Sequence, residues 1–418
     1  MPRLPLRPLR TVGERDPRRR TMSRRRLLGA SAVAVGAAGA GAGIYGVAEG
    51  AEQGEAATGT DTVAWDGPRQ AGIATTPPQA HAIFVGLDLL SKVGPAELIG
   101  IMKVWTADIA RLTQGRPALA DTEPELAAAP ARLTVTVGFG PGVFVALGRP
   151  EAAPPWLAPL PAFAIDRLDP AYTGADLALQ VCADDPVTVA HAVRVLVKNV
   201  RSLVTVRWTQ RGFRRARGTE APGTTMRNLM GQVDGTTNPE PGTADFDSLV
   251  WDDGADRPWM RDGTSMVLRR IRIELDTWDE LDRPGRELSV GRTLITGAPL
   301  TGGRETDEPD FTATDRNGIP VIPPSAHIAR ARHTHSGERI FRRVYNYDDA
   351  PDPGQVSNSG LLFVSFQRDI TTQFLPVQRR LDEFDALNEW TTPVGSAVFA
   401  IPPGAGSGSY LGAGLLDH

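Results

Sequence analysis

One order of apolar patterns occurs twice along the 418-residue chain, and it constrains the fold more than any other feature. Alternating apolar and polar residues indicate strands, and apolar residues spaced three or four apart indicate helices. In the first half, the order strand, helix, strand, strand, helix, strand runs through 81–90, 95–112, 133–139, 175–183, 186–203 and 204–208. In the second half, the same order runs through 265–275, 278–290, 339–347, 360–367, 372–387 and 396–401.

This repeated β-α-β-β-α-β order predicts an α+β protein with a duplicated ferredoxin-like fold, of the dimeric α+β barrel type. We expect an N-terminal half at 80–225 and a C-terminal half at 226–418, and the C-terminal half is expected to hold the functional site. Long connections at 140–174 and 291–324 exceed the usual length inside a compact domain, which favours a functional role. The later one leads into His327 and is expected to wrap a bound group.

The first fifty residues are arranged like an export signal. Residues 1–26 hold ten arginines and two acidic residues, and a weakly apolar stretch rich in alanine and glycine follows at 27–47. The sequence SRRRLL at 23–28 matches the twin-arginine pattern. We therefore expect a signal at 1–50 that directs export to the periplasm or beyond, a linker or N-terminal arm at 51–79, and no permanent membrane span. An uncleaved anchor is the alternative, although so much glycine makes a poor spanning helix.

Outside this basic head the chain is acidic. The whole chain has a net charge of −4, but residues 27–418 carry 35 basic and 47 acidic side chains, a balance of −12. This balance argues against nucleic acid as a partner. Cys182 is the only cysteine, which excludes an intramolecular disulfide, and its apolar segment indicates a buried thiol rather than a ligand to a cofactor.

The segment 323–349 carries side chains suited to chemistry. It holds three of the six histidines, His327, His333 and His335, and ends in a strand-like run with Arg342. Prolines before His327 give a rigid approach, so this imidazole is suited to bind a metal or haem iron from one side while a fixed positive charge lies on the other. His333 and His335 would suit a divalent metal if they lay on a strand, but no zinc-type spacing accompanies them.

A second segment, GQVDGTTNPEP at 231–241, places Asp234 in a glycine-flanked turn, where a carboxylate can lie close to a ligand. Each candidate taken alone has a simpler interpretation. Asp-Gly is a common turn, a loop histidine usually makes an ordinary hydrogen bond, and Arg342 is one of two strand arginines, of which one would face solvent.

The two segments together resemble a known family. GQVDG at 231–235 matches the GxxDG motif of the dye-decolourising peroxidases, which are bacterial haem enzymes, and AHI at 326–328 with IFRRVYNY at 340–347 resembles their proximal-histidine and distal-arginine segments. Further matches are QAGI at 70–73, GLLF at 360–363, QRRL at 378–381 and GSAVF at 395–399. The resemblance covers 70–403 and implies a duplicated ferredoxin-like fold. The segment QAGI at 70–73 resembles the exported, deferrochelatase-like branch of the family.

The resemblance implies one haem b per chain. His327 would be the axial ligand of the iron, Asp234 the acid and base on the opposite side, and Arg342 the cation beside it. Asp385 would accept the second N–H of the axial histidine. The residues expected to contact the haem are Gly235, Thr236, Thr237, Arg332, His333, Thr334 and Arg342.

The implied reaction reduces hydrogen peroxide and oxidises dyes, phenols or other one-electron donors. An aspartate in place of a histidine as base predicts an acidic optimum, below about pH 5.5. Tyr345, Tyr347 and Trp390 are candidates for relaying electrons, with ordinary packing as the alternative. A homo-oligomer is possible.

Three alternatives remain open at this point. The protein could release iron from haem, as the deferrochelatase-like branch is said to do. It could carry haem without catalysis, in which case Asp234→Asn would leave its function intact. A non-haem metal protein is the third alternative, although no ligand spacing supports it.

Overall fold

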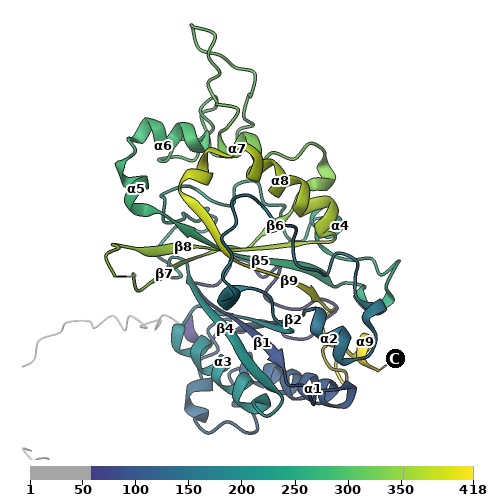
Figure 1. The fold of residues 1–418 in the computed structure, drawn as a ribbon. Coiled ribbons are helices and arrows are strands. Elements are labelled where there is room, and N and C mark those ends of the chain that lie inside the picture. The colour runs from purple at the N-terminus through teal and green to yellow at the C-terminus, as the bar shows by residue number, and fades with distance from the viewer. Residues whose placement is uncertain (1–57, 352, 418) are drawn as a thin grey trace, which may run out of the picture. The chain divides into compact units, whose positions relative to one another are not determined.

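Eight strands close into a ring in the computed structural model, which describes residues 58–351 and 353–417 (Figure 1). The ring order is β5-β9-β2-β3-β1-β4-β7-β8, closed by the pairing of β5 with β8, and the short β6 pairs with β8 beside it. The strands are β1 (His81–Leu89), β2 (Thr134–Phe139), β3 (Leu177–Ala183), β4 (Val204–Phe213), β5 (Thr264–Ile273), β6 (Phe341–Arg342), β7 (Tyr345–Asp349), β8 (Asn358–Gln367) and β9 (Thr391–Ile401). The expected export signal at 1–50 lies outside the described residues.

Each half of the ring has the same strand order. The N-terminal half runs β4-β1-β3-β2, and the C-terminal half runs β9-β5-β8-β7, which is the ferredoxin-like arrangement twice. The halves meet at two seams, where β4 pairs with β7 through Phe213 and Asn346, and β2 pairs with β9 through Phe139 and Ala400. The predicted duplicated ferredoxin-like α+β fold is therefore confirmed.

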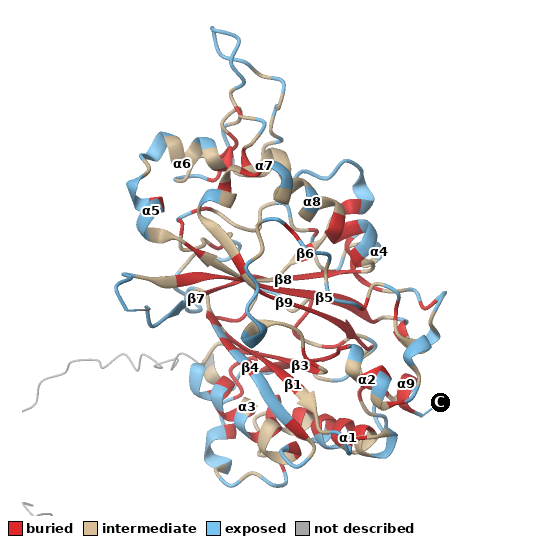
Figure 2. Cartoon of the chain, in the orientation of Figure 1, coloured by how far each residue is buried: buried red, intermediate tan, exposed pale blue. Residues whose placement is uncertain are grey.

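The alternation along the strands explains the two largest apolar clusters. On β1, Ala82 and Phe84 belong to one cluster, whereas Ile83, Val85 and Leu87 belong to the other, because successive side chains point to opposite faces. The first cluster fills the ring, and the second lies under α1 and α3. Most strands are accordingly buried along most of their length, whereas β4 is exposed at about half of its positions (Figure 2).

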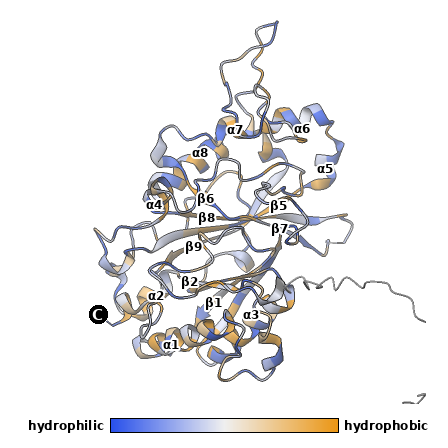
Figure 3. Ribbon diagram, turned by 180° about the vertical axis from the view of Figure 1, so that it is seen from behind, coloured by the Kyte–Doolittle hydropathy of each residue, from blue (hydrophilic) through white to orange (hydrophobic). Residues whose placement is uncertain are grey.

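Helices cover the outside of the ring. Figure 1 shows α1 and α3 outside the N-terminal strands and α5 to α8 on the opposite side, next to the C-terminal strands. Orange and blue segments alternate along α1 and α3 in Figure 3, as expected for helices with one buried face. The helices are α1 (Pro95–Leu112), α2 (Pro141–Ala146), α3 (Pro186–Val200), α4 (Ala244–Val250), α5 (Leu275–Glu280), α6 (Arg283–Val290), α7 (His327–Arg330), α8 (Leu375–Phe384) and α9 (Ala413–Leu416).

Two expected helices differ from the prediction. The segment 278–290 forms two short helices, α5 and α6, because Asp282 caps a new helix by accepting from Gly285 N–H and Pro284 cannot continue the preceding one. The segment 372–387 begins with a π-helical turn at Ile370–Phe374 and continues as α8.

The expected strand at 339–347 is present as β6 and β7, which pair with β8 in one continuous register. Between them, Arg343 N–H donates to the carbonyl of Val364. The two paired arginines differ in burial. Arg343 is fully buried and its guanidinium donates to Thr75 O and to Gln79 Oε1, whereas the Arg342 side chain is 23% exposed.

The described part of the expected linker, 58–79, is packed against the barrel and does not act as a free linker. Gln70 donates to the carbonyls of Val137 and Pro402 and accepts from Val137 N–H, which joins this segment to both halves. Ile73 is fully buried in the cluster that fills the ring. In the described ranges, no helix combines the length and apolar character that a membrane crossing requires.

Candidate active site

A tight hairpin holds Asp234 in place. Asp234 N–H donates to Met226 O at 2.8 Å, and Val233 forms an isolated β-bridge with Arg227. The glycine after the aspartate, Gly235, has φ of +131°, a conformation that side chains with a Cβ rarely adopt. The glycine-flanked turn expected from the sequence is therefore present.

Arg342, on β6, lies directly against this hairpin. Its Nη1 donates to Asp234 Oδ1 at 2.7 Å, and the Asp234 side chain is only 11% exposed. No described residue forms a hydrogen bond with Asp234 Oδ2. One oxygen of the carboxylate is thus held by the guanidinium while the other is available to carry a proton.

Asn238 fixes the position of Arg342, a role that the sequence had not indicated. Its side-chain Nδ2 donates to Arg342 O at 2.7 Å, and its Oδ1 accepts from Arg342 N–H at 3.0 Å. The amide therefore pairs with the backbone of Arg342 as a neighbouring strand would. In the sequence, the sign of this role is that Asn238 lies only four residues after Asp234, within the segment 231–241.

Glu305 ties the long 291–324 connection to the same hairpin. Its Oε1 accepts from the hydroxyls of Thr225 at 2.6 Å and Thr236 at 2.8 Å. Arg292 Nη1 donates to the backbone carbonyl of Glu305 at 2.7 Å. Burial is the main cause of the lowered pKa of Arg292, and the positive charge of Arg342 lowers it further. The connection thus borders the site, while part of it extends away from the barrel as an arm (Figure 1).

His327 begins the short helix α7 and binds Asp385 at the end of α8. Its Nδ1 lies 2.6 Å from Asp385 Oδ2, and Asp385 Oδ1 accepts from Leu387 N–H. The predicted contact between His327 and Asp385 is therefore present. No described residue forms a hydrogen bond with His327 Nε2, which leaves this nitrogen available to a ligand.

The pKa of His327 depends on burial and on the charges of Asp385, Arg342 and Asp234. Burial alone lowers this pKa, but the charge of Asp385 and the hydrogen bond to it outweigh burial, so that the pKa is raised. Arg342 also lowers the pKa of His327 and Asp234 raises it, through their charges. The charges of Arg342 and Asp234 therefore act on His327, and these two residues form an ion pair with each other at 2.7 Å.

Apolar side chains line the sheet near these polar groups. Met226, Val344 and Leu361 form a buried cluster, and the partly buried Ile271 and Phe363 pack against it. Ser365, which pairs with Arg342 across β6 and β8, is buried, and its hydroxyl has no hydrogen-bond partner among the described residues.

The remaining predicted cofactor contacts lie in two places. Thr236 is half-buried on the Asp234 hairpin and Thr237 is exposed there. Arg332, His333 and Thr334 are exposed in the segment between α7 and β6. The Arg332 guanidinium lies 4.9 Å from the centre of the Phe311 ring, and Thr334 donates to Glu338 through its backbone and its hydroxyl.

The aromatic relay candidates are in different surroundings. Tyr345 and Tyr347 are fully buried inside the ring. Trp390 is half-buried against the buried Trp278, with 5.2 Å between ring centres. The described residues contain no group of three or more side chains able to hold a metal ion, so no non-haem metal site is found among them.

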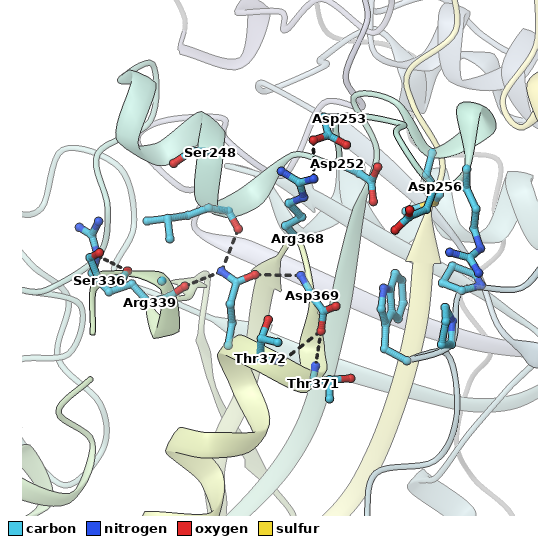
Figure 4. A pocket seen from close by; sticks show the side chains of 18 of the residues that line it. Ser248, Asp252, Asp253, Asp256, Ser336, Arg339, Arg368, Asp369, Thr371 and Thr372 are labelled. Carbon is cyan, nitrogen blue, oxygen red and sulfur yellow. Dashed lines mark hydrogen bonds and ion pairs between the residues drawn. The ribbon is translucent and has the colours of Figure 1, made fainter. Parts of the chain in front are cut away.

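A cavity of about 540 Å³ lies beside the segment that joins His327 to Arg342 (Figure 4). Arg368 pairs with Asp253 on its wall, and Asp369 accepts from the backbone N–H groups of Thr371 and Thr372. Neither Asp234 nor Arg342 nor His327 lines this cavity, so it is separate from the cluster described above.

Comparison with known proteins identifies the family of this chain. The family model "Dyp-type peroxidase, N-terminal" matches residues 70–214, and "Dyp-type peroxidase, C-terminal" matches residues 225–406. The chain belongs to the Dyp-type peroxidase family. The Dyp-type peroxidase "Dye-decolorizing peroxidase" of Thermobifida fusca is 42% identical over 323 residues, which cover 76% of this chain and 75% of that protein.

Solved structures of Dyp-type peroxidases agree with the fold. The crystal structure of the enzyme from Cellulomonas bogoriensis is 57% identical, with a TM-score of 0.84, covering 87% of this chain and all of that one. Ferric DtpA from Streptomyces lividans is 40% identical, with a TM-score of 0.82, covering 86% and 98%. "Deferrochelatase" of Escherichia coli O6:K15:H31 is 33% identical over 372 residues, covering 84% and 86%.

Proposed function

We propose that this Dyp-type peroxidase reduces hydrogen peroxide with haem as its cofactor, that His327 holds the iron, and that Asp234 and Arg342 act on the peroxide. The observation that carries the proposal is the Asp234–Arg342 ion pair at 2.7 Å, within electrostatic reach of a histidine whose Nε2 has no hydrogen-bond partner among the described residues. One-electron donors such as dyes or phenols are the second substrate.

The donor set fits haem. His327 would hold the iron through Nε2, and Asp385 orients its ring through the hydrogen bond at Nδ1. Ile271, Phe363 and the buried cluster of Met226, Val344 and Leu361 would supply apolar surface for the macrocycle. The unpartnered hydroxyl of Ser365 adds a polar group opposite Arg342.

Haem supplies the iron at which peroxide is cleaved and the electrons for that cleavage. Asp234 Oδ2, which has no hydrogen-bond partner among the described residues, takes a proton from one peroxide oxygen and returns it to the other. Arg342 stabilises the negative charge that develops on the departing oxygen, and its Nε and Nη2 groups have no partner among the described residues. Asp385 holds the N–H at His327 Nδ1, which makes Nε2 the stronger donor.

The test is the reaction of haem-loaded Asp234→Asn with one equivalent of peroxide, followed by stopped-flow absorbance of the Soret band. Losing general acid and base catalysis is expected to slow the spectral change by about 10²- to 10⁴-fold. Asp279→Asn, at a side chain 72% exposed, is the matched control and should react like the wild type. If Asp234→Asn reacts at the wild-type rate, the assignment is wrong and a haem carrier becomes the better description.

Release of iron from haem is the second candidate, because relatives 33–35% identical over 84% of this chain are named deferrochelatase. Incubation with haem under reducing conditions separates the two functions. Appearance of the fluorescence of metal-free porphyrin, without peroxide, would support iron release. Its absence, with peroxide-dependent donor oxidation present, would support the peroxidase alone.

Export by the twin-arginine route is part of the same proposal and rests on the sequence at 23–28. Replacing Arg24 and Arg25 by lysine is expected to retain the protein inside the cell, whereas the unchanged chain leaves the cytoplasm. Fractionation of cells that express both forms measures the difference. Equal distribution of the two forms would contradict the proposal.

A further inference from the structure

The cavity of about 540 Å³, separate from the candidate active site, has the size and the charge of a binding site for a small cation. Pockets that hold small molecules usually measure roughly 300 to 1,000 Å³. The charged side chains that line this cavity are five aspartates and three arginines, a formal balance of −2. A cavity with this balance attracts a positively charged ligand.

Two of the three arginines are already neutralised by aspartates of the same lining. Arg339 donates to both carboxylate oxygens of Asp245, and Arg368 donates to Asp253. Removing these two pairs from the count leaves the balance of −2 unchanged. Among the described residues of the lining, the charged groups without an ion pair are Asp252, Asp256, Asp369 and Arg257.

Asp252 and Asp256 are the carboxylates best placed to bind a cation. Asp252 Oδ1 accepts from Gly254 N–H at 2.7 Å, but Oδ2 has no hydrogen-bond partner among the described residues, and the Asp256 carboxylate has none there either. Burial raises the pKa of Asp252 in spite of the Gly254 hydrogen bond, and the charges of Asp253 and Asp256 raise it further. Figure 4 shows these three aspartates along the same side of the cavity, where a bound cation would relieve their repulsion.

Apolar side chains complete the lining. Trp156 is half-buried, and Leu249 and Met260 are buried. The face of an indole attracts cations and packs well against other rings. A ligand in this cavity therefore meets carboxylates and an indole, which together suit a positive charge carried on an aromatic or apolar body.

We propose that this cavity binds a primary aromatic ammonium compound, whose ammonium group pairs with Asp252 and Asp256 and whose ring packs against Trp156. The inference goes beyond the peroxidase function and does not depend on it, because binding involves no electron transfer. Ser336, Gly337 and Arg339 also line the cavity, and they belong to the segment that joins His327 to Arg342. A bound ammonium compound is therefore expected to stabilise this segment.

The first experiment measures binding to the haem-loaded protein by saturation-transfer NMR at pH 7, where the carboxylates are ionised. The probes are benzylammonium chloride and, as an uncharged compound of the same shape, benzyl alcohol at the same ionic strength. Benzylammonium is expected to bind saturably and at least about tenfold more tightly than benzyl alcohol, because only the charged probe pairs with the carboxylates.

Variants locate the probe in the cavity. Asp252→Asn and Asp256→Asn are each expected to weaken benzylammonium binding about threefold to fivefold, and Trp156→Leu is expected to weaken it about as much. Asp279→Asn, at a side chain 72% exposed outside this lining, is the matched control and should bind like wild type. Asp256 is exposed, so Asp256→Asn keeps the test valid if Trp156→Leu does not fold.

A second measurement follows hydrogen exchange of a peptide covering 336–342 with and without saturating benzylammonium. Exchange is expected to slow in wild type and to stay unchanged in the double variant Asp252→Asn with Asp256→Asn, because this variant no longer holds the probe. If wild type binds the probe without slower exchange, the inferred effect on the segment is overturned.

The binding site itself is overturned by any of three results: no saturable binding of benzylammonium, equal binding of benzyl alcohol, or wild-type affinity in the double variant. A loss of affinity in Asp279→Asn equal to that in Asp256→Asn would also overturn it, since attraction to the whole acidic surface would then explain the binding. A Soret band that does not respond to peroxide would count against the peroxidase proposal alone.

Discussion

Glu338 anchors the segment between His327 and Arg342, and Glu338→Gln tests the strength of this anchor. The residue is 5% exposed and accepts from the Thr334 N–H and hydroxyl at 2.8 Å each and from Arg380 of α8 at 2.9 Å. Burial raises the pKa of its carboxyl, but these hydrogen bonds and the charge of Arg380 outweigh burial and lower the pKa from 4.5 to about 2.

The direction of the pH effect follows from this lowered pKa. The folded value lies below the unfolded one, so the ionised carboxylate stabilises the segment above about pH 4.5, and the stabilisation is lost as the pH falls toward 2. At about 1.36 kcal/mol per pH unit, the interval corresponds to about 3 kcal/mol. Glu338→Gln keeps the size of the side chain and removes this contribution.

Hydrogen exchange of a peptide covering 331–340, corrected for intrinsic rates, measures the effect. At pH 7 we expect exchange in Glu338→Gln to be faster by up to about 100-fold, since local opening becomes about 3 kcal/mol easier. At pH 3 the difference should be much smaller, because wild type has lost about 2 kcal/mol by then. Glu383→Gln, at a side chain 73% exposed, is the control and should exchange like wild type. Equal protection at pH 7, or a difference that does not change with pH, would refute the reasoning.

Three further predictions concern the active site. Asn238→Ala removes both hydrogen bonds to the backbone of Arg342, each worth about 1 kcal/mol, and should slow the reaction with peroxide several-fold in stopped-flow while haem content stays the same. Asp385→Asn removes the negative charge behind His327 and should raise the reduction potential of the bound iron in spectroelectrochemistry; an unchanged potential would speak against a role for this carboxylate. Glu305→Gln weakens the tie between the 291–324 connection and the Asp234 hairpin, and should speed hydrogen exchange of both; if only one is affected, they are not coupled.

The fold was largely predictable because its signal is local and periodic. Strands such as β2 and β3 show alternation in a few residues, and the order of six segments, which occurs twice, identified both halves. The ends of helices were less predictable where a single capping residue or proline interrupts an apolar pattern. The break between α5 and α6 depends on the cap at Asp282, and Pro284 was the only sign of it.

The candidate active site was predictable only in part. His327, Asp234, Arg342 and Asp385 came from segments that resemble those of the family, and the structure pairs His327 with Asp385 and Arg342 with Asp234. Contacts between distant parts of the chain leave no periodic trace, so the burial of Arg343 against residues more than 260 positions earlier was not foreseen. The pairing of Asn238 with the backbone of Arg342 was hidden for the same reason.

At the two seams of the ring, the halves of the molecule are held together mainly by side chains. With a single residue pair in register at each seam, Phe213 with Asn346 and Phe139 with Ala400, the halves adhere as two subunits of a dimer would, through side chains rather than through a shared backbone ladder. Gln70 donates to the carbonyls of Val137 and Pro402, so its side chain bridges one seam. Cleavage of the peptide chain between the halves should therefore yield two fragments that reassemble. Replacement of Gln70 should weaken this reassembly before it disturbs the fold of either fragment.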